Sequence, residues 1–163
     1  METTEKKLTG DIQRFLCFGL NEEQYAIPLL SVKEVIAMPD VTPVPSTPNY
    51  FLGIMNLRGQ VISIIDLRTK FGFKTDKTQE TCVIICDLNG LSLGVVVSGV
   101  HNVLAVDTSD ISARPDLQGN KTSDYVTGVV KRDKRLILLI EIARALGVEG
   151  QKLAAQSTQK VAA

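Results

Sequence analysis

The segment YFLGIMNLRGQVISIIDLRTKFG, residues 50–72, decides the predicted fold, because a second segment of the chain repeats its pattern. Residues 125–147, YVTGVVKRDKRLILLIEIARALG, align with it without a gap. Self-similarity of this kind indicates a duplicated structural unit. The identical matched positions are tyrosines, glycines and isoleucines: Tyr50 and Tyr125, Gly53 and Gly128, Ile62 and Ile137, Ile65 and Ile140, Gly72 and Gly147.

The residues upstream of each segment repeat as well. Residues 15–38 align with residues 83–106, and a longer middle loop at residues 107–124 separates the two parts of the second copy. Shared apolar bias between two strand-rich segments is the alternative explanation, but the matched Tyr-x-x-Gly favours a true duplication. The matched positions are Leu20, Asn21, Val32, Val35 and Ala37 with Leu88, Asn89, Val100, Val103 and Ala105.

Each copy contains about five short apolar segments separated by turn signals, a pattern typical of strands in small sheets. The clearest turn is Asn89-Gly90, since both residues tolerate the positive φ that a tight hairpin requires. A small closed barrel removes the exposed edges of such a sheet. The sequence therefore predicts an all-β fold, with two tandem five-stranded barrels packed together.

A short helix is predicted to close each barrel. Apolar residues recur four positions apart at Leu67 and Phe71, and again at Ile142 and Leu146, which is helical spacing. A glycine, the usual stop signal of a helix, follows each segment. Asp66 is placed to cap the first helix.

The chain divides into a flexible N-terminus at residues 1–12, a folded part at residues 13–147 and a tail at residues 148–163. The first barrel is expected at about residues 13–73 and the second at about residues 81–147, with exchange of terminal strands between them left open. The tail is expected to be flexible or a frayed helix, and no function is assigned to it. The N-terminus shows no secretory signal, which favours a cytoplasmic protein with reduced thiols. Cys82 and Cys86 are interpreted as buried small hydrophobes.

The composition excludes several classes of function. Eighteen basic and eighteen acidic residues cancel, which disfavours nucleic-acid binding, and the single histidine, His101, leaves little for histidine-based metal sites or triads. A nucleic-acid-binding small barrel stays as the alternative, on the basic cluster at residues 131–135. An aspartic-hydrolase dyad of Asp66 and Glu141 lacks the Asp-Thr/Ser-Gly turns that such a site requires. We therefore expect no catalytic residues, no metal and no cofactor.

Several motifs together resemble one known family. NLRG at residues 56–59, DLR at 66–68, VTPVPSTP at 41–48 and YFLG at 50–53 are similar to the signature of the CheW coupling proteins of bacterial chemotaxis. Weaker matches are YAI at 25–27, VKEV at 32–35, GVVV at 94–97 and YVTG at 125–128. The resemblance covers about residues 14–147. Ser98 departs from the family, in which many members carry Asp at that position, and Glu141 replaces the more usual Asp.

The resemblance implies a fold of two SH3-like barrels and a function without catalysis. Family members couple the cytoplasmic helical hairpin of methyl-accepting chemoreceptors to the regulatory domain of the CheA histidine kinase, and they join rings in receptor arrays. A cytoplasmic location with recruitment to membrane-associated receptor arrays is implied as well, without direct membrane insertion.

The resemblance also assigns residues to two surfaces. Receptor binding falls on Arg58, Glu34, Val32 and Val35, and kinase binding on Met38 and Thr42. Two alternatives stay open at this point. Glu34 could hold Arg58 in place within the chain, and the two valines could belong to the core.

Overall fold

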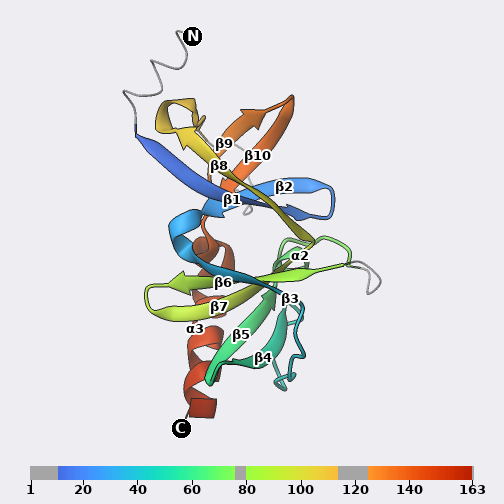
Figure 1. Cartoon of the computed structure of the whole chain (residues 1–163). Helices are drawn as coiled ribbons and strands as arrows, with labels where there is room; N and C mark the ends of the chain where they lie inside the picture. The colour runs from blue at the N-terminus through green and yellow to red at the C-terminus, as the bar shows by residue number, and fades with distance from the viewer. Residues whose placement is uncertain (1–10, 76–79, 114–124, 163) are drawn as a thin grey trace.

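Ten strands form two five-stranded sheets in the computed structural model, which describes residues 11–75, 80–113 and 125–162 (Figure 1). The strand order is β8-β1-β2-β10-β9 in one sheet, called barrel I here, and β3-β6-β7-β5-β4 in the other, called barrel II. The strands are β1 (Ile12–Leu20), β2 (Glu23–Pro28), β3 (Val32–Ala37), β4 (Phe51–Leu57), β5 (Gln60–Asp66), β6 (Cys82–Leu88), β7 (Leu91–Val97), β8 (Gly99–Asp107), β9 (Val126–Arg132) and β10 (Arg135–Ile140).

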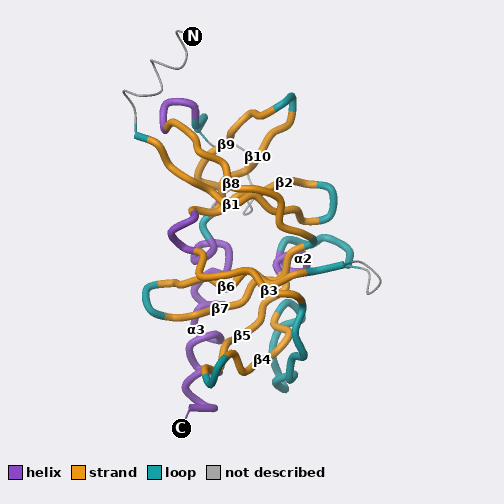
Figure 2. The backbone as a smooth tube through the Cα atoms, viewed as in Figure 1, coloured by secondary structure: helices purple, strands orange, loops and turns teal. Residues whose placement is uncertain are grey.

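The prediction of an all-β fold with two five-stranded, SH3-like barrels is confirmed. The two sheets lie one above the other, and the helices lie beside them rather than inside them (Figure 2). The helical segments are η1 (Leu29–Ser31), α2 (Leu67–Lys70), η2 (Thr108–Asp110) and α3 (Ile142–Ala162). None of the described helices combines the length and the apolar character that crossing a membrane requires.

Each barrel draws strands from both copies of the repeat. Barrel I combines β1 and β2 with β8, β9 and β10, whereas barrel II combines β3, β4 and β5 with β6 and β7. The two copies, expected at residues 13–73 and 81–147 with exchange of terminal strands left open, thus have their first two strands exchanged: β1 and β2 lie in the sheet of the second copy, and β6 and β7 in that of the first. The alignment of the copies places β1 over β6, β2 over β7 and β3 over β8, so the two barrels have the same internal order.

The repeated Tyr-x-x-Gly closes each barrel in the same way. In barrel II the backbone of Thr42 pairs with Ile54 of β4, through hydrogen bonds of 2.8 and 2.9 Å. In barrel I, Ser112 pairs with Val129 of β9 through bonds of 2.9 and 3.0 Å. The glycine before each paired strand residue, Gly53 or Gly128, has no room for a side chain beside the closing segment.

The two barrels share one large apolar core. It contains residues from both sheets, such as Leu16 and Phe18 of barrel I and Ile84 and Leu93 of barrel II. A separate small core fills each barrel, around Cys17 in barrel I and around Ile62 in barrel II. The barrels are therefore parts of one folded unit, because the largest apolar cluster lies between them.

An aromatic cluster lies at the junction of the barrels. The ring of Tyr25 on β2 stacks on Phe18 at 6.1 Å between centroids and contacts Phe71 at 5.8 Å and Phe73 at 6.5 Å. Phe71 in turn contacts Tyr125 at 4.3 Å. Rings from β2, from the segment after α2 and from the start of β9 thus join the two barrels.

The two predicted helices differ in length. Asp66 caps α2, since its carboxylate accepts a hydrogen bond of 3.0 Å from the backbone N–H of Arg68, as expected. The second helix was expected to end at Gly147, but α3 continues to Ala162 beyond a kink at that glycine, where φ is 71°. Beyond the kink Ala154 is fully buried in the shared core, and its carbonyl accepts a 3.2 Å hydrogen bond from Ser63 Oγ of β5. The segment expected to be a flexible tail or a frayed helix is thus helical, with one turn packed on barrel II.

Candidate partner-binding site

The turn between β4 and β5 presents Arg58 at the surface. Arg58 and Gly59 both have positive φ, 51° and 85°, as the central residues of a tight hairpin turn do. Asn56 Oδ1 accepts a 2.8 Å hydrogen bond from the backbone N–H of Gly59. The Asn-Leu-Arg-Gly motif is therefore a turn whose local chemistry fixes the position of an arginine.

Arg58 and Glu34 form a two-pronged ion pair. Arg58 Nη1 donates to Glu34 Oε2 at 2.8 Å, and Nη2 donates to Oε1 at 2.7 Å. The side chains of Arg58 and Glu34 are 69% and 32% exposed, so the arginine side chain is largely accessible from solvent. Glu34 lies on β3 and Arg58 follows β4, so the pair crosses the seam between the edge strands of barrel II, which Thr42 and Ile54 also bridge.

The ion pair shifts the pKa of both groups in the direction that keeps them charged. The hydrogen bonds from Arg58 lower the pKa of the Glu34 carboxyl, and those bonds raise the pKa of Arg58. Glu34 is therefore ionised throughout the neutral range, and the pair is present wherever the protein works near neutral pH.

The structure separates the two valines of the expected site. Val32 is half-buried and packs against the shared core. Its side chain therefore contributes to the core, which was one of the two alternatives for this residue. Val35 is 42% exposed on β3. The burial of β3 alternates along the strand, which places Val35 on the opposite face from Glu34 and Ile36. Thus Arg58 and Glu34 are together, whereas Val35 lies on the opposite, outer face of the same edge strand.

The two residues expected to bind the kinase follow β3. Met38 is 39% exposed, and Thr42 is exposed at the surface while its backbone closes barrel II. Val35 and Met38 are thus two exposed apolar side chains, one on β3 and one just after it.

Leu30 is an exposed residue that the sequence analysis did not single out. It lies in η1, which connects β2 of barrel I to β3 of barrel II, and is 99% exposed. An apolar groove of about 380 Å³ adjoins it, lined by residues that include Ile12, Phe15 and Leu29. The pattern Pro28-Leu29-Leu30-Ser31 contains no signal for this exposure, because a leucine pair after a strand is equally compatible with the core.

The residues considered for catalysis are used for structure. Asp66 is buried and bonds to the guanidinium of Arg68 at 3.1 Å through each of its two oxygens. Glu141 is paired with Arg144 at 3.1 Å. Within residues 11–75, 80–113 and 125–162, no group of three or more His, Cys, Asp or Glu side chains is arranged to hold a metal ion.

The basic cluster at residues 131–135 forms the turn between β9 and β10. Arg132 Nη2 donates to the carbonyl of Ala105 on β8 at 3.1 Å, which connects the edge strands of barrel I. Lys131, Lys134 and Arg135 are exposed, and Asp133 lies among them. A nucleic-acid-binding function at this turn stays an untested prediction.

Comparisons with known proteins agree with this architecture. The profile of the family described as the CheW-like domain matches residues 14–149. The chain is 34% identical over 153 residues to the chemotaxis protein CheW of Klebsiella aerogenes, covering 92% of each chain. It is 33% identical over 138 residues to the chemotaxis protein CheW of Helicobacter pylori, covering 83% of this chain and 82% of the relative.

A solved structure shows the same fold. The crystal structure of the scaffolding protein TtCheW from Thermoanaerobacter tengcongensis superposes with a TM-score of 0.77 at 33% sequence identity. The alignment covers 86% of this chain and 96% of that one. The chain therefore belongs to the CheW-like domain family.

Proposed function

We propose that the chain is a non-catalytic adaptor of bacterial chemotaxis signalling, which couples chemoreceptor cytoplasmic tips to a CheA-type histidine kinase. Relatives that align over nearly their whole length are named chemotaxis proteins, and the structural neighbour is named a scaffolding protein. The protein would act in the cytoplasm at membrane-associated receptor arrays. Protein contacts would carry the signal, without a cofactor.

The observation that carries the proposal is the ion pair of Arg58 and Glu34 at the seam of barrel II. The matched positions in barrel I are Asn102 and Asp133, which cannot form such a pair. Barrel I closes without an ion pair at this place, with backbone pairing and a hydrogen bond from Arg132 to the carbonyl of Ala105 across the seam. This asymmetry supports a role for Arg58 in binding.

The receptor surface would comprise Arg58, Glu34 and Val35, with Val32 supporting β3 from the core side. An exposed guanidinium already held by one carboxylate can donate its remaining N–H groups to a carboxylate or carbonyl of a receptor helix. The apolar side chain of Val35 would add contact area on the outer face of β3, opposite to Glu34. Exposed apolar groups rimmed by charged ones are typical of protein interaction surfaces.

The kinase surface would lie near Met38 and Thr42, where the chain leaves β3 and returns to pair with β4. A barrel of the kinase regulatory domain would pack against this edge. With a receptor surface and a kinase surface on one chain, the adaptor would join rings in receptor arrays.

The experiment is calorimetric titration of a receptor cytoplasmic hairpin into the full chain and its variants. Arg58→Glu should weaken binding at least about tenfold, as expected for the loss of charge-assisted hydrogen bonds. The double variant with Arg58→Glu and Glu34→Arg restores the ion pair with reversed polarity. If Arg58 contacts the receptor, the double variant stays weak.

Two results would contradict this assignment. Full recovery of binding in the double variant would mean that the pair only holds the seam. Unchanged binding in folded Arg58→Glu would remove Arg58 from the receptor surface. Arg144→Glu is the matched control, since it breaks another exposed ion pair, with Glu141, and should bind as the wild type does.

A further inference from the structure

The end of barrel II is closed by a polar contact. Lys33 Nζ donates to Ser92 Oγ at 2.7 Å, and Gln60 Nε2 approaches the same oxygen at 3.4 Å. Ser92 is buried. Side chains from β3, β7 and β5 thus meet at the end of barrel II.

The matched positions of barrel I carry His101, Gln24 and Arg135, and these residues line an open pocket of about 700 Å³. In the part of the chain that the structure describes, no side-chain hydrogen bond joins these three residues. The residues at these three matched positions therefore contact one another at the end of barrel II, whereas in barrel I they line an open pocket. The difference lies in the side chains, because the strand order is the same in both barrels.

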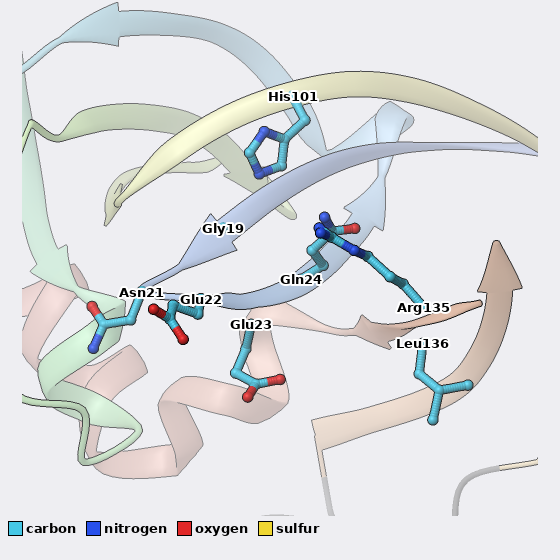
Figure 3. Close-up of a pocket in the computed structure, with 8 residues that line it drawn as sticks. All are labelled: Gly19, Asn21, Glu22, Glu23, Gln24, His101, Arg135 and Leu136. Carbon is cyan, nitrogen blue, oxygen red and sulfur yellow. The ribbon is translucent and has the colours of Figure 1, made fainter. Parts of the chain in front are cut away.

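The pocket offers hydrogen-bond donors on one side. His101 of β8 lies over Gly19 of β1, and the head groups of Gln24 and Arg135 lie on the same side of the β1–β2 hairpin as His101 (Figure 3). A Cβ atom at Gly19 would lie 3.1 Å from His101 Nε2. Glycine at this position therefore keeps space open next to the imidazole.

The charges in the pocket limit what it can bind. Arg135 supplies a positive charge with several N–H donors, and Gln24 supplies an amide. Glu22 and Glu23 of the hairpin turn also line the pocket, and Glu23 points away from His101 (Figure 3). The two nearby carboxylates repel every anion, and they repel a multiply charged one such as phosphate more strongly than a singly charged one. A singly charged carboxylate matches the planar donor fork of an arginine best.

We infer that the end of barrel I, between His101, Gln24 and Arg135, is a binding site for a carboxylate group. Arg135 binds the two oxygens, while the Gln24 amide and His101 contact them from the neighbouring strands. The carboxylate comes from an acidic side chain of a protein or from a free carboxylic acid. This inference does not depend on the partners proposed above.

The test is an NMR titration of the labelled full chain with three probes at constant ionic strength: acetate, the blocked peptide acetyl-Gly-Glu-Gly-amide, and inorganic phosphate. His101 is the only histidine of the chain, so its ring signals are unambiguous. We expect saturable shifts of the His101 ring and the Arg135 side chain with acetate and with the peptide. Tighter binding of the peptide assigns the group to a protein side chain, and equal or tighter binding of acetate assigns it to a free acid. Both of these results support the site.

Matched variants separate the pocket from general surface charge. Arg135→Gln should weaken binding about tenfold, the factor expected for loss of a charge-assisted bond. Lys134→Gln removes the same charge from the same turn outside the pocket and should leave binding within about twofold. Gly19→Ala should also weaken binding, without any change in charge. The inference is overturned by the absence of saturation, by equal losses in the Arg135 and Lys134 variants, or by tighter binding of phosphate than of acetate.

Discussion

The carbonyl group of Thr42 lies against the face of Gly53 on which any other residue would carry its Cβ atom. Gly53 also has a φ of 146°, which side chains rarely allow. Gly53 therefore allows barrel II to close for two reasons. It adopts the required backbone conformation, and it leaves space for the closing segment.

Gly53→Ala should destabilise the fold by about 2–5 kcal/mol, from backbone strain together with overpacking. The matched control is Gly59→Ala, since Gly59 has a φ of 85° but open space around it. That variant should lose only about 1 kcal/mol. Urea unfolding measures both. Equal losses in the two variants would show that the contact with Thr42 contributes nothing.

The part of α3 beyond its kink is expected to contribute to the stability of the folded unit. Ala154→Asp places a carboxylate in the shared core and should cost several kcal/mol, roughly the cost of burying an unpaired charge after relaxation. Lys152→Asp, on the exposed side of the same helix, should change stability by less than about 0.5 kcal/mol. Thermal unfolding distinguishes the two variants. Unchanged stability of the Ala154→Asp variant would mean that this turn is dispensable for the fold.

The ion pair of Glu34 should make stability depend on pH in one direction. The folded state lowers the pKa of Glu34, so the contribution is present above the ordinary glutamate pKa of about 4.3 and is lost as pH falls through the lowered value. The stability difference between the wild type and Glu34→Gln should therefore be largest near neutral pH and shrink below about pH 4. Urea unfolding of both proteins between neutral pH and pH values below about 4 measures this difference. A difference that grows on acidification would contradict the assigned pair.

The cysteines should differ in reactivity. Burial raises the pKa of Cys17 to about 11 and that of Cys86 to about 12, so neither forms the reactive thiolate near pH 8. Cys82 is only half-buried, and burial raises its pKa as well. Alkylation of the native protein, followed by mass spectrometry, should modify Cys82 first and all three cysteines only after unfolding. Early modification of Cys86 would show that β6 opens locally.

Local patterns predicted the strands and turns well, because these depend on residues close in sequence. Asn89-Gly90 adopts the positive φ values of a hairpin turn, 52° and 92°, and Asp66 caps α2. The repeated Gly53 and Gly128 predicted a duplication, and the structure gives the physical reason, which is closure of each barrel.

Long-range features could not be predicted in the same way. An alternating strand pattern does not identify the neighbouring strand, so the placement of β3 in barrel II and of β8 in barrel I was not predictable. Gly147 interrupts the helix with a kink, as its sequence position predicts. The helix continues beyond the kink because residues such as Ala154 are buried in the shared core, which is a long-range contact. Of the expected site, Arg58 and Glu34 were correctly expected to be able to pair, whereas the burial of Val32 depends on packing between the barrels.

We propose that this one chain has separate surfaces for a receptor and for a kinase. The most direct test is calorimetric titration of the regulatory domain of a CheA-type kinase from the same organism into the wild type, Arg58→Glu and Met38→Glu. We expect saturable one-to-one binding to the wild type, the same affinity for Arg58→Glu, and binding at least about tenfold weaker for Met38→Glu. An absence of binding at micromolar concentrations, or equal losses in both variants, would contradict it.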